Sequence, residues 1–191
     1  MKNRTGTDRS KTKKWDRQTQ MVRAGSMRSD FGEMSEAMFM TSAFTYETAE
    51  VAEARFDGRA EGFTYSRQTN PTVAMFEERM ALLEGADVGR ATGTGMAAMT
   101  ASLMASLRAG DHVLAARALF GSCRWLLDTY LPRLGIETTV VDGTDLEAWK
   151  AGIKPNTKIL FTETPANPTL EIVDIRALAD LAHENGALLV V

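Results

Sequence analysis

The feature that most constrains the fold of this chain is the run Ala-Thr-Gly-Thr-Gly-Met at residues 91–96, which small residues follow at 97–101. It predicts the end of a strand, a tight turn and the first turn of a helix. Gly93 and Gly95 let the backbone bend sharply and approach a ligand closely. The free N–H groups at the start of a helix attract an anion, so we expect a phosphate at this turn. The alternative is a glycine-rich loop before a core helix.

The spacing of Gly93, Gly95 and Ala98 also fits the dinucleotide pattern G-x-G-x-x-G/A. In that case Arg117, at the end of the next predicted strand, could meet a 2′-phosphate. An NADP-binding Rossmann oxidoreductase is therefore an alternative. It leaves two further motifs of the chain, at residues 65–67 and 163–167, without a role.

The sequence after this run alternates between helical and strand patterns. Helices are predicted at about 96–108, 122–134, 145–151 and from Asp174 to Asn185, and strands at 112–116, 136–141, 158–162 and 187–191. This alternation is typical of an α/β fold with a mostly parallel sheet and helices on both faces. Because the last apolar run reads as an unfinished helix–strand unit, we expect the polypeptide to continue beyond Val191.

The sequence before this run shows no such alternation of helical and strand patterns. Residues 1–60 predict an extended N-terminal arm with short helical pieces, and residues 61–191 are assigned to the large domain. Asn70 and Pro71 predict the cap and first position of a helix that Gly85 ends. The apolar residues of this helix recur at helical spacing, at Val73, Phe76, Met80 and Leu83.

Composition excludes several classes of function. The net charge of the chain is −3. Residues 1–28 are basic, with nine Lys/Arg and two Asp, and we interpret them as a solvated terminus. A nucleic-acid arm or a transit peptide is the alternative. We expect neither nucleic acid nor a membrane as partner. Cys123 is the only cysteine, and His112 and His183 are the only histidines. An intrachain disulfide is thus impossible, no metal site is expected, and a cytoplasmic setting is favoured.

Three segments carry candidate binding residues. Tyr65 and Arg67 fall on one side of an extended segment, where a hydroxyl and a guanidinium could clamp a phosphate. Asn167 lies in the proline-containing turn 163–169, from which its amide could donate to a ligand oxygen. Phe120 follows a predicted strand and could stack on a planar ring. The alternatives are a surface loop, a structural turn and a core phenylalanine.

Taken together, these motifs resemble the cystathionine γ-synthase-like family, the Cys/Met-metabolism enzymes that use pyridoxal 5′-phosphate. The resemblance runs from about Trp15 to Val191. It implies the large domain of pyridoxal-phosphate fold type I, which is aspartate aminotransferase-like. It also implies that the cofactor phosphate is held by Gly95 and Met96, and by Tyr65 and Arg67 of a neighbouring subunit. Asn167 would lie beside the phenolic oxygen of the cofactor, and Phe120 would stack on its ring.

The Phe-Gly-Ser-Cys form at residues 120–123 resembles the O-succinylhomoserine sulfhydrylase branch of the family. It implies a transferase of methionine biosynthesis that makes L-homocysteine and succinate from O-succinyl-L-homoserine and sulfide. Phe120 replaces the usual Tyr, so no acid–base role falls to this residue. Cystathionine γ-synthase, cystathionine γ-lyase and O-acetylhomoserine sulfhydrylase remain alternatives.

The resemblance also implies residues that this chain does not contain. The Schiff-base Lys and the Asp at the pyridine nitrogen are expected beyond Val191, so no catalytic residue is assigned, and a catalytically inactive fragment is a further alternative. Lys150, Lys154 and Lys158 are interpreted as surface residues. The implied assembly is a homo-oligomer, at least a dimer and commonly a tetramer.

Overall fold

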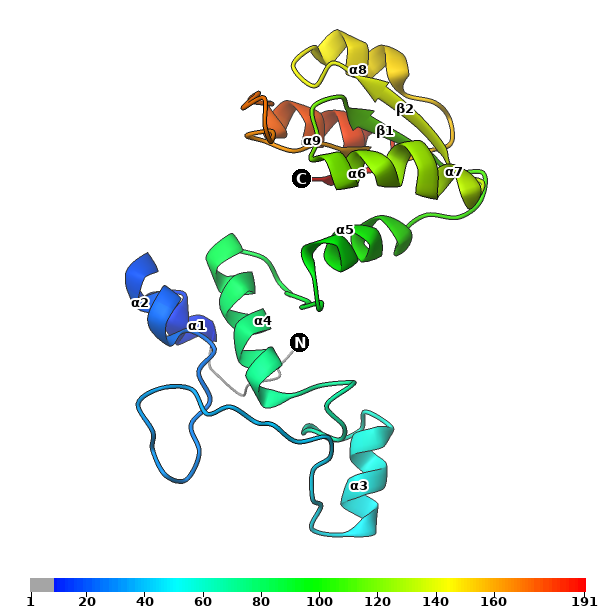
Figure 1. The fold of residues 1–191 in the computed structure, drawn as a ribbon. Coiled ribbons are helices and arrows are strands. Elements are labelled where there is room, and N and C mark those ends of the chain that lie inside the picture. Colours follow the sequence, from blue (N-terminus) through cyan, green and yellow to red (C-terminus); the bar gives the residue numbers. More distant parts are fainter. Residues whose placement is uncertain (1–8) are drawn as a thin grey trace. The chain divides into compact units, whose positions relative to one another are not determined.

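The computed structural model describes residues 9–191, and its contacts divide the chain into two compact units, Met1–Ala91 and Thr92–Val191 (Figure 1). The first unit contains the helices α1 (Arg9–Thr12), α2 (Arg17–Arg23), α3 (Ala49–Phe56) and α4 (Pro71–Glu84). Short helices joined by extended chain thus form the described part of the predicted arm. The domain boundary at residues 60–61 stays a prediction. Within residues 9–191, none of the helices combines the length and apolarity that a membrane span requires.

Helix α4 begins and ends where the sequence predicts. The Asn70 side chain accepts a hydrogen bond from the Thr72 N–H at 2.9 Å, Pro71 occupies the first position, and Gly85 ends the helix in the left-handed conformation (φ 67°). The apolar stripe is nevertheless not the buried face, because Phe76 is 55% exposed. The buried residues are Pro71, Ala74, Met75, Glu77, Glu78, Ala81 and Leu82.

The arm lies close to the buried face of α4. Gly25, at φ +73°, brings the arm so close that a Cβ there would lie 2.8 Å from the Met75 carbonyl oxygen. Ala24, which is fully buried, precedes it in the arm, and Ala74 and Ala81 line the buried face of α4. The larger Met75 and Leu82 are buried on this face as well, whereas Phe76 and Met80 lie outside it.

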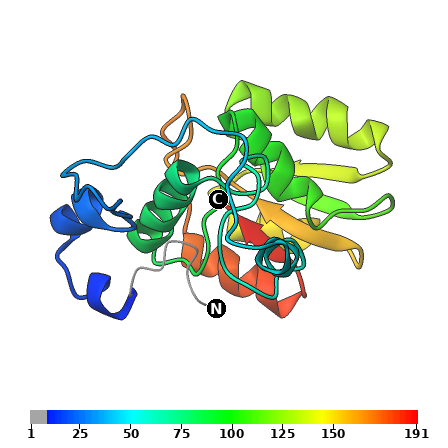
Figure 2. The ribbon, with the colours of Figure 1, turned by 90° about the horizontal axis from the view of Figure 1, so that it is seen from below.

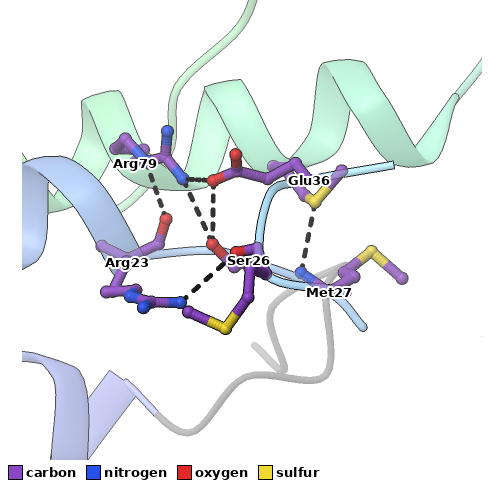
Figure 3. A network of polar contacts seen from close by, with 8 residues as sticks. Arg23, Ser26, Met27, Glu36 and Arg79 are labelled. Atoms are coloured by element: carbon purple, nitrogen blue, oxygen red, sulfur yellow. Dashed lines mark hydrogen bonds and ion pairs between the residues drawn. The ribbon is translucent and has the colours of Figure 1, made fainter. Parts of the chain in front are cut away.

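A polar network fixes the arm to α4 (Figure 3). Arg79 Nε donates to the Ala24 carbonyl oxygen at 3.0 Å, and the same guanidinium donates to Ser26 Oγ at 3.2 Å and pairs with Glu36. Ser26 Oγ also donates to Glu36 Oε1 at 2.9 Å. The hydrogen bond from Arg79 is the main cause that lowers the pKa of Glu36 to about 2. Residues 24–36 are therefore tied to α4 by charge-assisted hydrogen bonds.

The second unit is built on a four-stranded parallel sheet. Its strands are β1 (His112–Ala116), β2 (Glu137–Val141), β3 (Thr157–Phe161) and β4 (Leu188–Val190), in the order β2-β1-β3-β4. These strands match the four predicted ranges to within one residue at every end. Val113 and Ala115 of β1 belong to one core, and Leu114 and Ala116 belong to the other. The period-2 alternation of strand side chains thus separates two hydrophobic cores.

Helices cover both faces of this sheet, as the sequence predicts. They are α5 (Gly95–Met104), α6 (Gly121–Trp125), the π-helical η1 (Leu126–Tyr130), α7 (Leu131–Arg133), α8 (Leu146–Gly152) and α9 (Ile175–Glu184). Figure 2 shows α5 and α6 (green) on one side of the sheet and α9 (red-orange) on the other. The predicted helix 96–108 ends earlier, at Met104. The predicted helix 122–134 changes to π-helical geometry just before Pro132, whose ring removes one N–H donor.

A buried histidine joins three strands near their amino ends. His112 is fully buried, with Nδ1 2.8 Å from Thr157 Oγ1 on β3 and Nε2 2.9 Å from Thr139 Oγ1 on β2. Burial lowers the pKa of His112, and the nearby Lys154 charge lowers it further, while Glu137 opposes the shift. The folded sheet therefore favours the neutral imidazole.

We expect the free energy of unfolding to fall as the pH is lowered from about 7 to about 5. The unfolded chain takes up a proton near the ordinary histidine pKa, whereas folded His112 resists protonation, so acid favours unfolding. Urea unfolding at several pH values measures this slope. A His112→Gln variant should flatten it, and the exposed control His183→Gln should keep it. An unchanged slope in His112→Gln would show that another group causes the dependence.

Candidate functional site

The start of α5 leaves backbone donors available to a ligand. Thr94 caps the helix, since its Oγ1 accepts a hydrogen bond from the Ala97 N–H and its carbonyl accepts one from the Ala98 N–H, both at 3.1 Å. Within residues 9–191, the N–H groups of Gly95 and Met96 have no acceptor. The predicted helix start is thus confirmed, but residues 88–92 form no strand before it. The N–H pair points to an anion site.

The two glycines of this turn have no packing role within the chain. A Cβ built on Gly93 or Gly95 would meet no atom within 4 Å. Neither glycine has a positive φ. Glycine at these positions instead leaves the backbone open to close approach from outside.

The carboxyl edge of the sheet brings further candidate residues to the same end of the unit. Helix α5 leads through the turn at Gly110 into the amino end of β1, so its own amino end lies toward the opposite, carboxyl edge. Phe120 follows β1 at this edge, and the loop 162–174 follows β3. Ligand sites of parallel sheets lie beyond this edge.

One carboxylate joins two of these loops. Glu163 Oε2 accepts a hydrogen bond from the Phe120 N–H, and Glu163 Oε1 accepts one from the Asn167 N–H, both at 2.7 Å. The structure therefore brings the predicted residues Phe120 and Asn167 together. The sequence interpretation gave Glu163 no role, because nothing in the local pattern indicates a partner 43 residues away.

The side chains of both residues are accessible. Phe120 is 45% exposed and belongs to neither hydrophobic core, and Asn167 is exposed. Their chain neighbours Leu119 and Ala166 are buried. Each loop is thus anchored by a buried residue and presents the next residue outward. An exposed ring and an exposed amide are suited to stacking on a planar ligand and donating to its oxygen.

Tyr65 and Arg67 lie in the first unit and in a turn, which corrects the expected extended segment. The Tyr65 carbonyl accepts hydrogen bonds from the Gln68 and Thr69 N–H groups at 2.8 and 3.0 Å. The two side chains still lie together, with the Arg67 guanidinium carbon 5.4 Å from the centroid of the Tyr65 ring. Arg67 forms no ion pair with residues 9–191, so its charge remains available.

The arm fixes this turn from a distant part of the chain. The Ser66 N–H donates to the Ser42 carbonyl at 2.9 Å, and Ser66 Oγ donates to the Thr41 carbonyl. Asn70 Nδ2 donates to Ser66 Oγ at 3.0 Å and to the Phe39 carbonyl at 2.9 Å. These bonds impose the turn, which explains why the local sequence alone did not predict it.

Two titratable groups near the carboxyl edge, Cys123 and Asp142, have shifted pKa values with clear causes. Burial and the Glu163 charge both raise the pKa of Cys123, so this buried thiol stays protonated. Hydrogen bonds from Thr144, with a contribution from the Arg117 charge, lower the pKa of Asp142. On the polar surface, Lys150 and Lys154 pair with Glu147 and Glu137, and Lys158 is exposed, as the sequence predicts.

The second unit has a parallel sheet whose carboxyl edge presents anion donors and accessible ring and amide groups. This arrangement defines a class of ligand-binding α/β proteins. Within that class, the model of the Cys/Met metabolism PLP-dependent enzyme family matches residues 18–191, and the chain belongs to this family. This membership decides against the NADP-binding alternative. Pyridoxal 5′-phosphate is the cofactor of the family.

Curated relatives include several activities. The chain is 51% identical to an O-succinylhomoserine sulfhydrylase of Pseudomonas aeruginosa, over 91% of this chain and 43% of the relative. It is 49% identical to one of Mycobacterium tuberculosis, over 88% and 42%. An L-methionine γ-lyase of Fusobacterium nucleatum subsp. polymorphum is 39% identical, over 94% and 46%. The chain thus spans less than half the length of these relatives.

Solved structures share the fold. A putative O-acetylhomoserine (thiol)-lyase of Campylobacter jejuni, solved with a pyridoxyl-lysine monophosphate, matches with a TM-score of 0.86 at 28% identity, over 92% of this chain and 43% of that chain. The metB protein of Corynebacterium glutamicum matches with a TM-score of 0.84 at 34% identity, over 93% and 45%. The expected α/β fold is confirmed.

The donors at the carboxyl edge fit pyridoxal phosphate. The two available N–H groups of α5 suit a phosphate, the exposed Phe120 ring suits a pyridine, and the Asn167 amide suits a phenolic oxygen. Thr94 Oγ1 accepts the cap hydrogen bond of α5 and keeps its own O–H as a further donor at this turn.

We expect Gly95→Val to reduce pyridoxal phosphate binding without unfolding the protein that carries this chain. A Cβ at this position would meet no atom of residues 9–191 within 4 Å, so we expect stability to change by less than about 1 kcal/mol. The new side chain would block approach to the α5 donors and reduce cofactor affinity by about tenfold or more. Equilibrium dialysis measures the affinity. Ser102→Val, near the other end of α5, is the control, and equal affinity in both variants would exclude this phosphate position.

Proposed function

We propose that the protein carrying this chain is a pyridoxal-phosphate-dependent sulfhydrylase. It would convert O-succinyl-L-homoserine and hydrogen sulfide into L-homocysteine and succinate. The bond between Cγ and the succinyl oxygen breaks, a bond between Cγ and sulfur forms, and the sulfide supplies the proton that succinate or the solvent takes up. The chemistry would contribute to methionine biosynthesis.

Sequence identity to the curated relatives is the observation that carries this proposal. The O-succinylhomoserine sulfhydrylases are 49–51% identical to the chain, whereas an O-acetyl-L-homoserine sulfhydrylase is 37% and methionine γ-lyases are 36–39% identical. The Phe-Gly-Ser-Cys form at residues 120–123 supports the same branch. We therefore favour the succinylated substrate and replacement over elimination.

The residues of the second unit would hold the cofactor without taking part in proton transfer. When bound, pyridoxal phosphate supplies the electron sink for proton loss from the substrate. The N–H groups of Gly95 and Met96 would bind its phosphate, Phe120 would stack on its ring, and Asn167 would donate to its phenolic oxygen. Phe120 has no hydroxyl, so it orients the ring and moves no proton.

Tyr65 and Arg67 are proposed to serve the cofactor of a neighbouring subunit. Their side chains lie together, and Arg67 has no carboxylate partner within residues 9–191. A guanidinium offers a phosphate two charge-assisted hydrogen bonds, and the tyrosine hydroxyl offers another. The active assembly would then be at least a dimer, and we propose a homotetramer.

Substrate preference tests the proposed reaction. The purified protein should form homocysteine from O-succinyl-L-homoserine and sulfide with a higher kcat/KM than from the O-acetyl substrate, and should release little 2-oxobutyrate from methionine. Thiol quantification and 2-oxo-acid detection measure the two products. Preference for O-acetyl-L-homoserine, or dominant elimination, would replace the proposal by the corresponding alternative within the family.

We expect Arg67→Ala to reduce cofactor affinity by about tenfold or more, since a phosphate loses charge-assisted bonds. Arg67→Lys should restore part of the affinity because it keeps the charge. Arg59→Ala changes an exposed arginine of the same unit and is the matched control. Unchanged affinity in Arg67→Ala would remove this residue from the cofactor site.

Mixed assemblies test whether Arg67 serves a neighbour. Arg67→Ala and Gly95→Val subunits are mixed, exchanged and assayed together. If the two residues act in sites of different subunits, a mixed dimer contains one site in which both positions are intact. Activity should therefore reappear on mixing. Absence of recovery, with mixed dimers demonstrated, would assign Arg67 to its own subunit.

A further inference from the structure

The Glu163 side chain bonds to both loops that carry the proposed ring and amide contacts. Its two carboxylate oxygens are divided between them, with Phe120 N–H on one and Asn167 N–H on the other, each at 2.7 Å. Both distances are typical of charge-assisted hydrogen bonds. The side chain is only partly exposed. Glu163 thus links the chain after β1 to the chain after β3.

These bonds reach the backbone of the two exposed residues themselves. The buried neighbours Leu119 and Ala166 anchor each loop in the unit, one residue before Phe120 and Asn167. The carboxylate adds one restraint that acts on the backbone N–H groups of Phe120 and Asn167 together. The backbone positions from which the ring and the amide project are therefore linked through one shared group.

Only an ionised carboxylate of the length of glutamate can accept hydrogen bonds from both N–H groups. It offers acceptors on two oxygens, whereas a glutamine offers one acceptor oxygen and would turn an NH₂ donor toward one of the two N–H groups. An aspartate is one methylene shorter and cannot hold both N–H groups at 2.7 Å without moving a loop.

We propose that Glu163 is a positioning residue that fixes the Phe120 ring and the Asn167 amide at the spacing that a pyridoxal ring requires. It acts through these two residues and contacts no reacting atom. The inference rests on the proposed function for the identity of the ligand. The linkage between the two loops does not depend on it.

Separate measurements test the linkage between the loops and the binding of the cofactor. Hydrogen exchange of the cofactor-free protein should show faster exchange of the Phe120 and Asn167 amides in Glu163→Gln than in the unchanged protein. Titration with pyridoxal phosphate should show affinity reduced by about tenfold, the size of one misplaced polar contact. At saturating cofactor, the visible circular dichroism of the bound ring should shrink, because the ring is held less uniquely.

The control is Glu171→Gln. Glu171 lies in the same loop, and its carboxylate forms no hydrogen bond or ion pair with residues 9–191. This variant removes the same charge and should keep exchange, affinity and circular dichroism unchanged. Glu163→Asp, which keeps the charge, should behave like Glu163→Gln, because length and not charge alone is required.

The outcomes distinguish this inference from the proposed function. If the unchanged protein does not bind pyridoxal phosphate, the proposed function fails, and amide exchange alone decides whether Glu163 links the loops. If the unchanged protein binds and Glu163→Gln keeps its affinity and circular dichroism, the positioning role is overturned. Loss of folding in both Glu163 variants, with Glu171→Gln folded, would also overturn it, because Glu163 would then be a purely structural residue.

Discussion

The parallel pairing of β1 with both β2 and β3 determines where a ligand can bind in the second unit. Because these strands run in one direction, the chain leaves all of them at the same edge, and neighbouring strands deliver neighbouring loops. The adjacency of β1 and β3 is what allows Glu163 to reach the Phe120 N–H. Helix α5 runs back along the sheet before β1, so its free N–H groups point toward that same edge.

The two edges of the sheet differ in how their polar groups are satisfied. At the amino edge, His112 bonds to threonines on both neighbouring strands and is fully buried, which closes this end. At the carboxyl edge, the N–H groups of Gly95 and Met96 have no acceptor within residues 9–191. A polar group costs free energy when it is buried without a partner, so the amino edge supports stability and the carboxyl edge is suited to a ligand.

The parts of this fold that local patterns encode could be predicted from the sequence. Caps at Asn70, Thr94 and Asp174 mark helix starts through contacts two or three residues away, and the strands follow from apolar runs. The buried face of α4 could not be predicted, because it depends on the close approach of Gly25 from a distant part of the chain. The turn at Tyr65 and the role of Glu163 depend on hydrogen-bond partners 24 to 43 residues away, which no local pattern contains.

Charge explains why the proposed site needs more than the second unit. Gly95, Met96, Phe120 and Asn167 are neutral, and backbone donors at a helix start stabilise an anion by only about 0.3–1 kcal/mol, up to about 2 kcal/mol when partly buried. The Glu163 carboxylate is negative and is directed at two N–H groups. A phosphate with two negative charges therefore requires a cation from elsewhere. Arg67, which has no carboxylate partner within residues 9–191, is the arginine that our proposal assigns to this role in a neighbouring subunit.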